Sequence, residues 1–195
     1  MKKLITLSLM MGLLLIAGGM AAADEYCWNA GLIIGGSKAG GDAMGGIGAE
    51  ITREFGDYLE LGFTAYAQSE VSAEHQDASG QEYHLESGYS ALLIKPKLRV
   101  NEWLEIGLPL ETGNGLLQYR YANEYREDKV WTEEILDRVN HSVYSAGIEP
   151  KLLLPGHGAV TLGFGYRGTG PLRTDLAESG ELNGLWGRMG YSYRF

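Results

Sequence analysis

The sequence has one cysteine and only five prolines among its 195 residues. The single Cys27 cannot form an intrachain disulfide, so the fold cannot depend on the cross-links that stabilise many small secreted domains. Long hydrophobic runs are also missing after the N-terminal segment, because glycines and charged residues interrupt every later apolar stretch. These absences exclude a disulfide-stabilised scaffold and a helical membrane-spanning protein.

The N-terminal segment has the three parts of a secretory signal peptide. Two lysines follow Met1, an apolar run covers residues 4–17, and small residues stand at Ala21 and Ala23 just before the first acids. A basic start, a short apolar segment and an A-x-A site are the features that signal peptidase recognises. We predict that residues 1–23 are a cleaved signal peptide and that residues 24–195 form one domain.

Positive charge is scarce. The chain carries 16 Lys and Arg against 25 Asp and Glu, a net charge of −9, and loss of Lys2 and Lys3 with the signal peptide takes the charge to −11. A protein this acidic repels the phosphate backbone, so no nucleic-acid partner is expected.

Apolar and polar side chains alternate strictly in several segments. In residues 58–68, Leu59, Leu61 and Phe63 fall on one side of the alternation, and polar or small residues fall on the other. Residues 103–111 and 160–167 repeat the pattern, which is typical of a β-strand with one apolar face. The same pattern predicts eight strands, at residues 27–37, 43–55, 58–69, 84–100, 102–117, 140–154, 158–169 and 182–195.

The connectors between these strands alternate in length. Three are tight turns rich in Gly, Asn, Asp or Pro, near residues 55–58, 100–102 and 154–158. The others, at residues 38–42, 70–83, 118–139 and 170–181, are mostly long and polar. Together with a signal peptide, this pattern predicts an all-β fold: an eight-stranded antiparallel transmembrane β-barrel with short periplasmic turns and long extracellular loops.

Two prolines interrupt the predicted strands. Pro96 and Pro150 each lie five residues before a turn, within the similar segments YSALLIKPKL and YSAGIEPKLL. Proline removes a donor from the strand ladder and normally avoids interior strands. We therefore predict β-bulges at both positions, near the end of the barrel that carries the short turns.

Charged residues stand on the face opposite the apolar one. If the aliphatic face is turned to lipid, six acids and seven bases point into the lumen: Glu50, Glu54, Glu60, Glu105, Glu111, Glu149, Lys95, Lys97, Arg99, Lys151, Arg167, Arg188 and Arg194. An eight-stranded lumen is narrow enough for side chains to fill it, and buried charges need partners. This predicts an ion-paired interior and argues against a wide aqueous pore. A soluble β-sandwich, the alternative, would expose the charges and stack the apolar faces.

Aromatic residues mark the ends of the predicted strands. Tyr58 and Trp103 begin strands beside short turns, and the chain ends in GYSYRF, with Tyr191, Tyr193 and Phe195 on one face of the alternation. Such rings favour the two membrane interfaces. This distribution favours the barrel over the sandwich.

The final segment GYSYRF resembles the C-terminal assembly signal of Gram-negative outer-membrane proteins, which the insertion machinery reads. With eight strands and one-sided loops, residues 24–195 resemble the small eight-stranded barrels of the OmpA membrane domain and OmpX type. The resemblance implies a monomer in the cell outer membrane, with membrane lipid, lipopolysaccharide and the assembly machinery as partners. It implies no cofactor.

Three functions agree with these patterns. The first is a structural or surface-interaction role through acidic external loops, at residues 69–84 and 170–182, whose acid spacing matches no defined metal loop. The second is a narrow channel for ions or small solutes. The third is a lipid A-modifying enzyme, for which His141 with Ser142, or His84 with Ser87, are candidate pairs without a catalytic motif. Residues 128–139 fit either a short surface helix or an extension of a strand.

Overall fold

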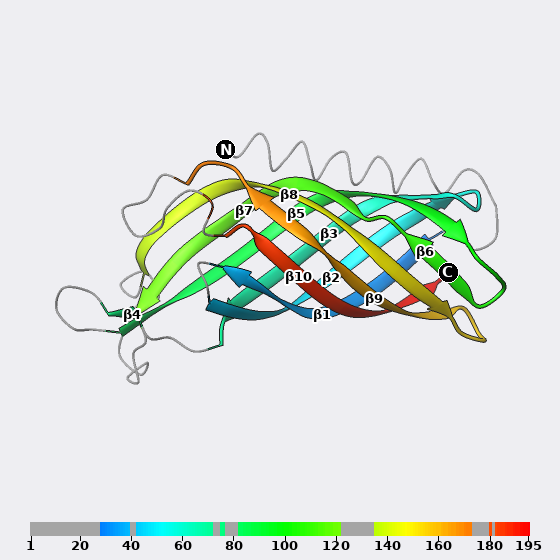
Figure 1. The fold of residues 1–195 in the computed structure, drawn as a ribbon, viewed down its shortest axis with the longest axis horizontal. Coiled ribbons are helices and arrows are strands. Elements are labelled where there is room, and N and C mark those ends of the chain that lie inside the picture. Colours follow the sequence, from blue (N-terminus) through cyan, green and yellow to red (C-terminus); the bar gives the residue numbers. More distant parts are fainter. Residues whose placement is uncertain are drawn as a thin grey trace.

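A computed structural model describes residues 28–39, 42–71, 75–76, 82–121, 135–172, 180 and 182–195. The signal peptide predicted for residues 1–23 lies outside this part of the chain and stays a prediction. Strands make up most of the described residues (Figure 1). None of those residues form a helix long and apolar enough to cross a membrane.

The strands form one antiparallel sheet that closes on itself. Their bounds are β1 Trp28–Ala39, β2 Asp42–Phe55, β3 Leu59–Glu70, β4 His75–Gln76, β5 Glu82–Arg99, β6 Leu104–Gly107, β7 Leu110–Tyr121, β8 Ile135–Leu153, β9 Gly158–Thr169 and β10 Gly184–Arg194. The two segments β6 and β7 follow one another between β5 and β8, and β4 is a two-residue ladder beside β5. The ring therefore has eight strand positions, which confirms the predicted eight-stranded antiparallel barrel.

The ring is closed by the first and last strands of the barrel. Pairing between β1 and β10 runs from Asn29 opposite Arg194 to Ser37 opposite Trp186. At its end, Trp28 and Phe195 exchange two backbone hydrogen bonds of 3.1 and 2.9 Å. The C-terminal segment is thus the closing strand, and the ring leaves neither β1 nor β10 with an unpaired edge.

The barrel is apolar outside and polar inside. Leu32 is 73% exposed and Phe164 60% exposed, whereas Glu60 is 1% and Lys95 2% exposed. The aromatic residues of the closing strand, Tyr191, Tyr193 and Phe195, also face outward and are about half exposed. This inversion of the usual soluble pattern is what a barrel surrounded by lipid requires.

Several element boundaries differ from those predicted. The connector after β1 is only residues 40–41, because both flanking strands extend into the predicted loop at 38–42. Likewise, β7 continues to Tyr121 and β8 begins at Ile135, so residues 135–139 extend a strand and are not helical. For residues 135–139 the strand extension, one of the two alternatives predicted for residues 128–139, is therefore confirmed, and residues 128–134 lie outside the described part of the chain.

The predicted bulges at the prolines are wrong. The register between β3 and β5 runs up to and includes Pro96 without a shift. The register between β8 and β9 is likewise the same on both sides of Pro150, although Pro150 itself is not paired with β9. Leu108 donates to the Pro96 carbonyl (2.8 Å) and Gly147 to the Pro109 carbonyl (3.0 Å), but neither proline has an N–H to return. The N–H groups that Pro96 and Pro109 lack would stand at the gap between β6 and β7. Pro96 and Pro150 therefore remove hydrogen bonds without shifting the register.

Glycine is required where neighbouring strands come closest inside the barrel. A Cβ on Gly113 of β7 would lie 2.0 Å from the backbone oxygen of Ser90, which cannot move independently of its strand. We expect Gly113→Ala to lower the free energy of unfolding by roughly 1–3 kcal/mol, the usual range for overpacking. Urea titration of the refolded barrel, followed by tryptophan fluorescence, measures this.

The matched control for that substitution is Gly187→Ala. Its Cβ would meet nothing closer than a Phe164 ring carbon at 3.8 Å, so it should unfold at nearly the urea concentration of the unaltered protein. Equal stability of the two variants would contradict the close approach at Gly113.

Candidate functional site

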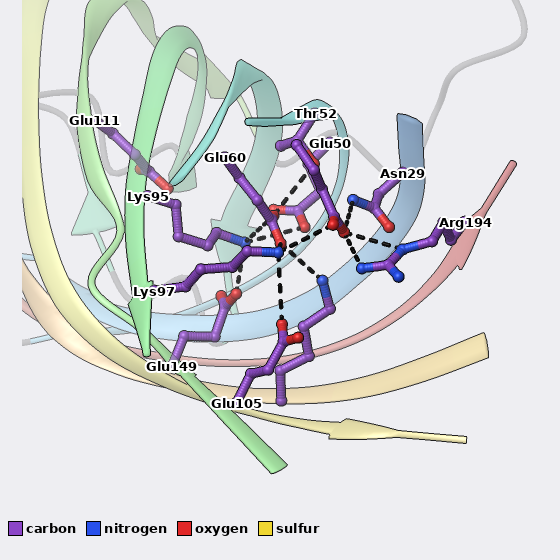
Figure 2. Close-up of polar contacts among 12 residues, drawn as sticks. Asn29, Glu50, Thr52, Glu60, Lys95, Lys97, Glu105, Glu111, Glu149 and Arg194 are labelled. Carbon is purple, nitrogen blue, oxygen red and sulfur yellow. Dashed lines mark hydrogen bonds and ion pairs between the residues drawn. The ribbon is translucent and has the colours of Figure 1, made fainter. Parts of the chain in front are cut away.

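The lumen holds a cluster of charged side chains contributed by nearly every strand (Figure 2). Inward positions alternate with lipid-facing ones, so each strand can place a charge inside at every second residue. The cluster consists of Glu50 and Glu54 on β2, Glu60 on β3, Lys95 and Lys97 on β5, Glu105 on β6, Glu111 on β7, Glu149 and Lys151 on β8, and Arg188 and Arg194 on β10.

Lys95 lies at the centre of the cluster. Its Nζ is 2.6 Å from a carboxylate oxygen of Glu149, 3.3 Å from Glu50 and 3.8 Å from Glu60, and its side chain is 2% exposed. Three carboxylates from three different strands therefore surround one ammonium group. Because an unpaired buried ammonium costs several kcal/mol, these contacts are the condition for placing a lysine here.

Glu60 is the acid that gathers the most cations. It accepts a hydrogen bond from Lys151 Nζ at 2.9 Å and lies 3.5 Å from Lys97 Nζ, in addition to its contact with Lys95. The Thr52 hydroxyl donates to its second oxygen at 3.3 Å. Lys97 also lies 3.7 Å from Glu105. One carboxylate thus joins β2, β3, β5 and β8 across the lumen.

The cluster extends to the end of the barrel that carries the short turns. There Glu54 accepts hydrogen bonds from Arg194 Nε and Asn29 Nδ2, both at 3.0 Å, and lies 3.1 Å from Lys97 Nζ. Arg194 belongs to the closing strand and Asn29 to the first. The polar contacts therefore cross the seam at which the barrel closes.

In the other direction the cluster continues through Arg188. Its guanidinium donates to Glu111 at 2.6 Å and to Glu149 at 3.0 Å, and its charge lies 4.7 Å from the centre of the Trp186 ring. The Tyr89 hydroxyl then donates to Glu111 at 3.3 Å. A continuous series of polar contacts consequently runs along the lumen from the closing seam to Tyr89.

Two of the predicted lumen cations stand apart from the acids. Arg167 is buried in the lumen, but the hydrogen bonds it makes go to neutral groups, the Gln68 side chain and the Tyr89 hydroxyl, both at 3.1 Å, with its charge 4.5 Å from the Tyr89 ring centre. Arg99 lies exposed beyond the cluster, where its guanidinium donates to the backbone carbonyls of Asn101 and Glu102. The prediction that placed Arg99 in the interior network is therefore corrected. At Arg99, β5 has already reached the barrel mouth, so the side chain is exposed.

Sequence reasoning missed an apolar cluster that fills the lumen at the opposite end. Its buried members are Met44, Leu85, Leu117, Tyr119, Leu172 and Leu182. The first four lie on inward positions of β2, β5 and β7, and continuing the alternation to the strand ends could have identified them. The last two come from the connector between β9 and β10, which has no periodic signal.

The Ser and His pairs considered for catalysis do not form. His141 is buried in the lumen, whereas its neighbour Ser142 points to the other face of β8. In the same way Ser87 is buried, whereas His84 faces outward and contacts Glu86 at 3.3 Å. A serine nucleophile must be hydrogen-bonded to its base, so neither pair can act as a catalytic dyad.

The acidic loop residues lie mostly outside the described part of the chain, including Glu74, Asp77, Asp175, Glu178 and Glu181. Among the residues that the structure describes, no group of three or more His, Cys, Asp and Glu side chains is arranged to hold a metal ion.

Comparison with known proteins identifies the fold. No protein-family model and no curated protein matches the sequence. Among solved structures, a major outer membrane protein from Thermus thermophilus aligns with 88% of this chain and 100% of its own, at 11% identity and a TM-score of 0.62. Neisserial surface protein A aligns with 89% of this chain and 99% of its own, at 9% identity and a TM-score of 0.55.

At such identities the likeness shows the fold alone. That fold is the eight-stranded outer-membrane β-barrel, and the apolar exterior of this chain agrees with it. The chain therefore has the fold of an outer-membrane β-barrel, and charged side chains line part of its lumen.

The ion pairs of the lumen should be essential to stability. Glu149→Gln removes one charge without changing the volume, and leaves Lys95 and Arg188 each short of a carboxylate. We expect a loss of about 3 kcal/mol in the free energy of unfolding, because breaking a buried pair leaves an uncompensated charge. Urea titration in lipid vesicles, read by heat-dependent gel mobility, measures this loss.

The control is Glu86→Gln on the outer face, where Glu86 lies 3.3 Å from Arg120 and is 29% exposed. Glu86 is only partly buried, and the glutamine oxygen can still accept the hydrogen bonds from Gln118 and Arg120. This variant should therefore lose at most about 1 kcal/mol, the upper end for pairs near the surface. If Glu149→Gln were equally stable, the lumen pairs would not support the fold.

Proposed function

We propose that this protein is an integral outer-membrane barrel whose lumen is closed, and that it acts structurally and through surface interactions at its loop-bearing end. The observation that carries the proposal is the filling of the lumen by mutually paired side chains. Lys95, Glu60 and Glu149 are each 2% exposed or less, so no open aqueous path runs beside them. A narrow channel, the main alternative, needs such a path.

The charged cluster resists opening because its central members, Lys95, Glu149 and Arg188, contact one another closely. To admit an ion beside Arg188, for example, its contacts to Glu111 and Glu149 would have to break together. Each of those contacts involves two charged partners, and such hydrogen bonds are roughly twice as strong as neutral ones. The cost of opening supports a closed resting state.

The apolar cluster forms a second barrier further along the lumen. Leu117 is 0% and Met44 2% exposed, and both point inward near the end opposite the short turns. A hydrophobic constriction excludes ions by excluding water. An ion could therefore pass only if the charged cluster and the apolar cluster opened together.

With its lumen closed, the barrel can meet other molecules only at its ends and along its lipid-facing wall. The segment from the end of β3 to the start of β5 carries Glu70, Glu74, Asp77 and Glu82, without a single Lys or Arg between residues 69 and 84. Acidic connectors of this kind suit contact with cations, including divalent cations that bridge carboxylates to the phosphates of lipopolysaccharide. A surface role is therefore the function that the closed barrel supports best.

Conductance tests the closed lumen directly. The refolded protein, inserted into a planar lipid bilayer, should give no discrete current steps over a range of applied voltages. Insertion is checked in parallel by the heat-dependent gel shift of protein recovered from the same lipid. Reproducible steps of uniform size would favour the channel instead.

The surface role is tested by separating the barrel from its loops. Replacing residues 71–81, which include Glu74 and Asp77, by a four-residue turn removes β4 but leaves β3 and β5 intact, so the variant should insert and shift on gels like the unaltered protein. In a host lacking the gene, the unaltered protein should restore any change in detergent sensitivity, and the shortened protein should not. Full restoration by the shortened protein would indicate a purely structural barrel.

A further inference from the structure

The lumen charges predicted from the sequence amount to six acids and six bases once Arg99 is left out. Six acids, Glu50, Glu54, Glu60, Glu105, Glu111 and Glu149, stand against the six bases Lys95, Lys97, Lys151, Arg167, Arg188 and Arg194. Arg99 lies outside the paired cluster, on the lumen side of β5 at the barrel mouth beside the short turns, and among the described residues its guanidinium contacts backbone carbonyls rather than an acid. A cation without an acidic partner at a mouth attracts anions from the solution outside.

Arg99 lines a half-enclosed cup of about 290 Å³ at that mouth. The cup is walled by the ends of β1, β5, β8, β9 and β10 and by the two turns that follow β5 and β8. Its polar lining consists of Asn29, Arg99, Glu102, Lys151, His157 and Arg194. Cations outnumber acids in this lining, with Glu102 the single carboxylate.

The cations of the cup are held in place, but some of their N–H donors remain available to a ligand. Lys151 and Arg194 are each fixed by one acid beneath the cup, Glu60 at 2.9 Å and Glu54 at 3.0 Å. Arg99 is held only by two long hydrogen bonds, of 3.4 and 3.5 Å, to backbone carbonyls of its turn. A guanidinium has five N–H donors, so most of those on Arg99 remain available to a ligand.

The turns that wall the cup are held by hydrogen bonds of their own. The Asn101 side chain accepts hydrogen bonds from the backbone N–H groups of Trp103 and Leu104, at 3.0 and 2.9 Å. On the other side, His157 adopts a left-handed backbone conformation (φ 72°), rare for a residue other than glycine, and its carbonyl accepts from the N–H of Arg194 at 2.9 Å. Turns fixed in this way present the cup in one shape, which reduces the entropy lost on binding.

We propose that this cup binds a phosphate group, held by the Arg99 guanidinium with Lys151 and Arg194. The planar fork of an arginine matches two phosphate oxygens, and lysine adds a point charge. The phosphate comes either free in solution or from the headgroup of a lipid at the same membrane face. Glu102 opposes the ligand's charge and limits its affinity.

Phosphate binding is measured by NMR on the full chain refolded in a maltoside detergent, which contains no phosphate of its own. Inorganic phosphate should shift the Arg99 Nε–Hε signal along a saturating curve. Arg99→Gln, followed through the backbone N–H signals of Lys151 and Arg194, should weaken the apparent affinity about tenfold, because a hydrogen bond to a charged group is lost. Glu102→Gln should strengthen it.

The matched control is Arg138→Gln, which removes an exposed arginine near the opposite end of the barrel and should leave the affinity unchanged. The heat-dependent gel shift confirms that each variant is folded. A shift that never saturates, or equal affinities in the Arg99 and Arg138 variants, would mean an adventitious ion only and would overturn the proposal.

The source of the phosphate is distinguished in nanodiscs of phosphatidylglycerol. If a lipid headgroup fills the cup, the Arg99 signal will already stand at its bound position without added phosphate, and adding phosphate will not move it. If the ligand is free phosphate, the signal will start at its unbound position and titrate as it does in detergent. Either result supports the site, whereas an Arg99 signal that neither phosphate nor lipid moves would contradict it.

Discussion

The structure depends on the pairing of β1 with β10. In the hydrocarbon core of a membrane no water is available to satisfy a backbone N–H or C=O, so a sheet can cross it only as a closed ring. Trp28 and Phe195, at the two ends of the described chain, exchange the last pair of these bonds. Once the ring is closed, every strand has a lipid-facing side and a lumen-facing side, and the placement of charges follows.

Because closure fixes the two faces, alternation alone predicted much of the fold and of the candidate site. The strand positions, the aliphatic exterior and the inward direction of residues such as Lys95 and Glu60 all follow from a period of two. Which acid meets which base does not follow. Lys95 reaches Glu149 across 54 positions of sequence, and that meeting is decided by the curvature of the ring and the stagger of its strands.

The predictions were wrong where the alternation of apolar and polar residues does not determine the structure. Arg99 has the parity of a lumen residue, but parity does not indicate where the lumen ends. The prolines were predicted to cause bulges because they lack a donor, yet a missing hydrogen bond does not require an extra residue, and Pro96 keeps the register of its neighbours. Leu172 and Leu182 pack into the lumen from a connector, and no sequence period marks that contact.

The charged cluster and the apolar cluster of the lumen differ in physical character, and they constrain the barrel in different ways. Ion pairs such as Arg188 with Glu111 are directional and depend on each partner being present, so they fix the strands relative to one another. The apolar cluster around Leu117 is non-directional and excludes water by its bulk alone. A change that weakens one of the two clusters leaves the other in place. An ion gains no free energy by entering the apolar cluster, and an apolar group gains none among the paired charges.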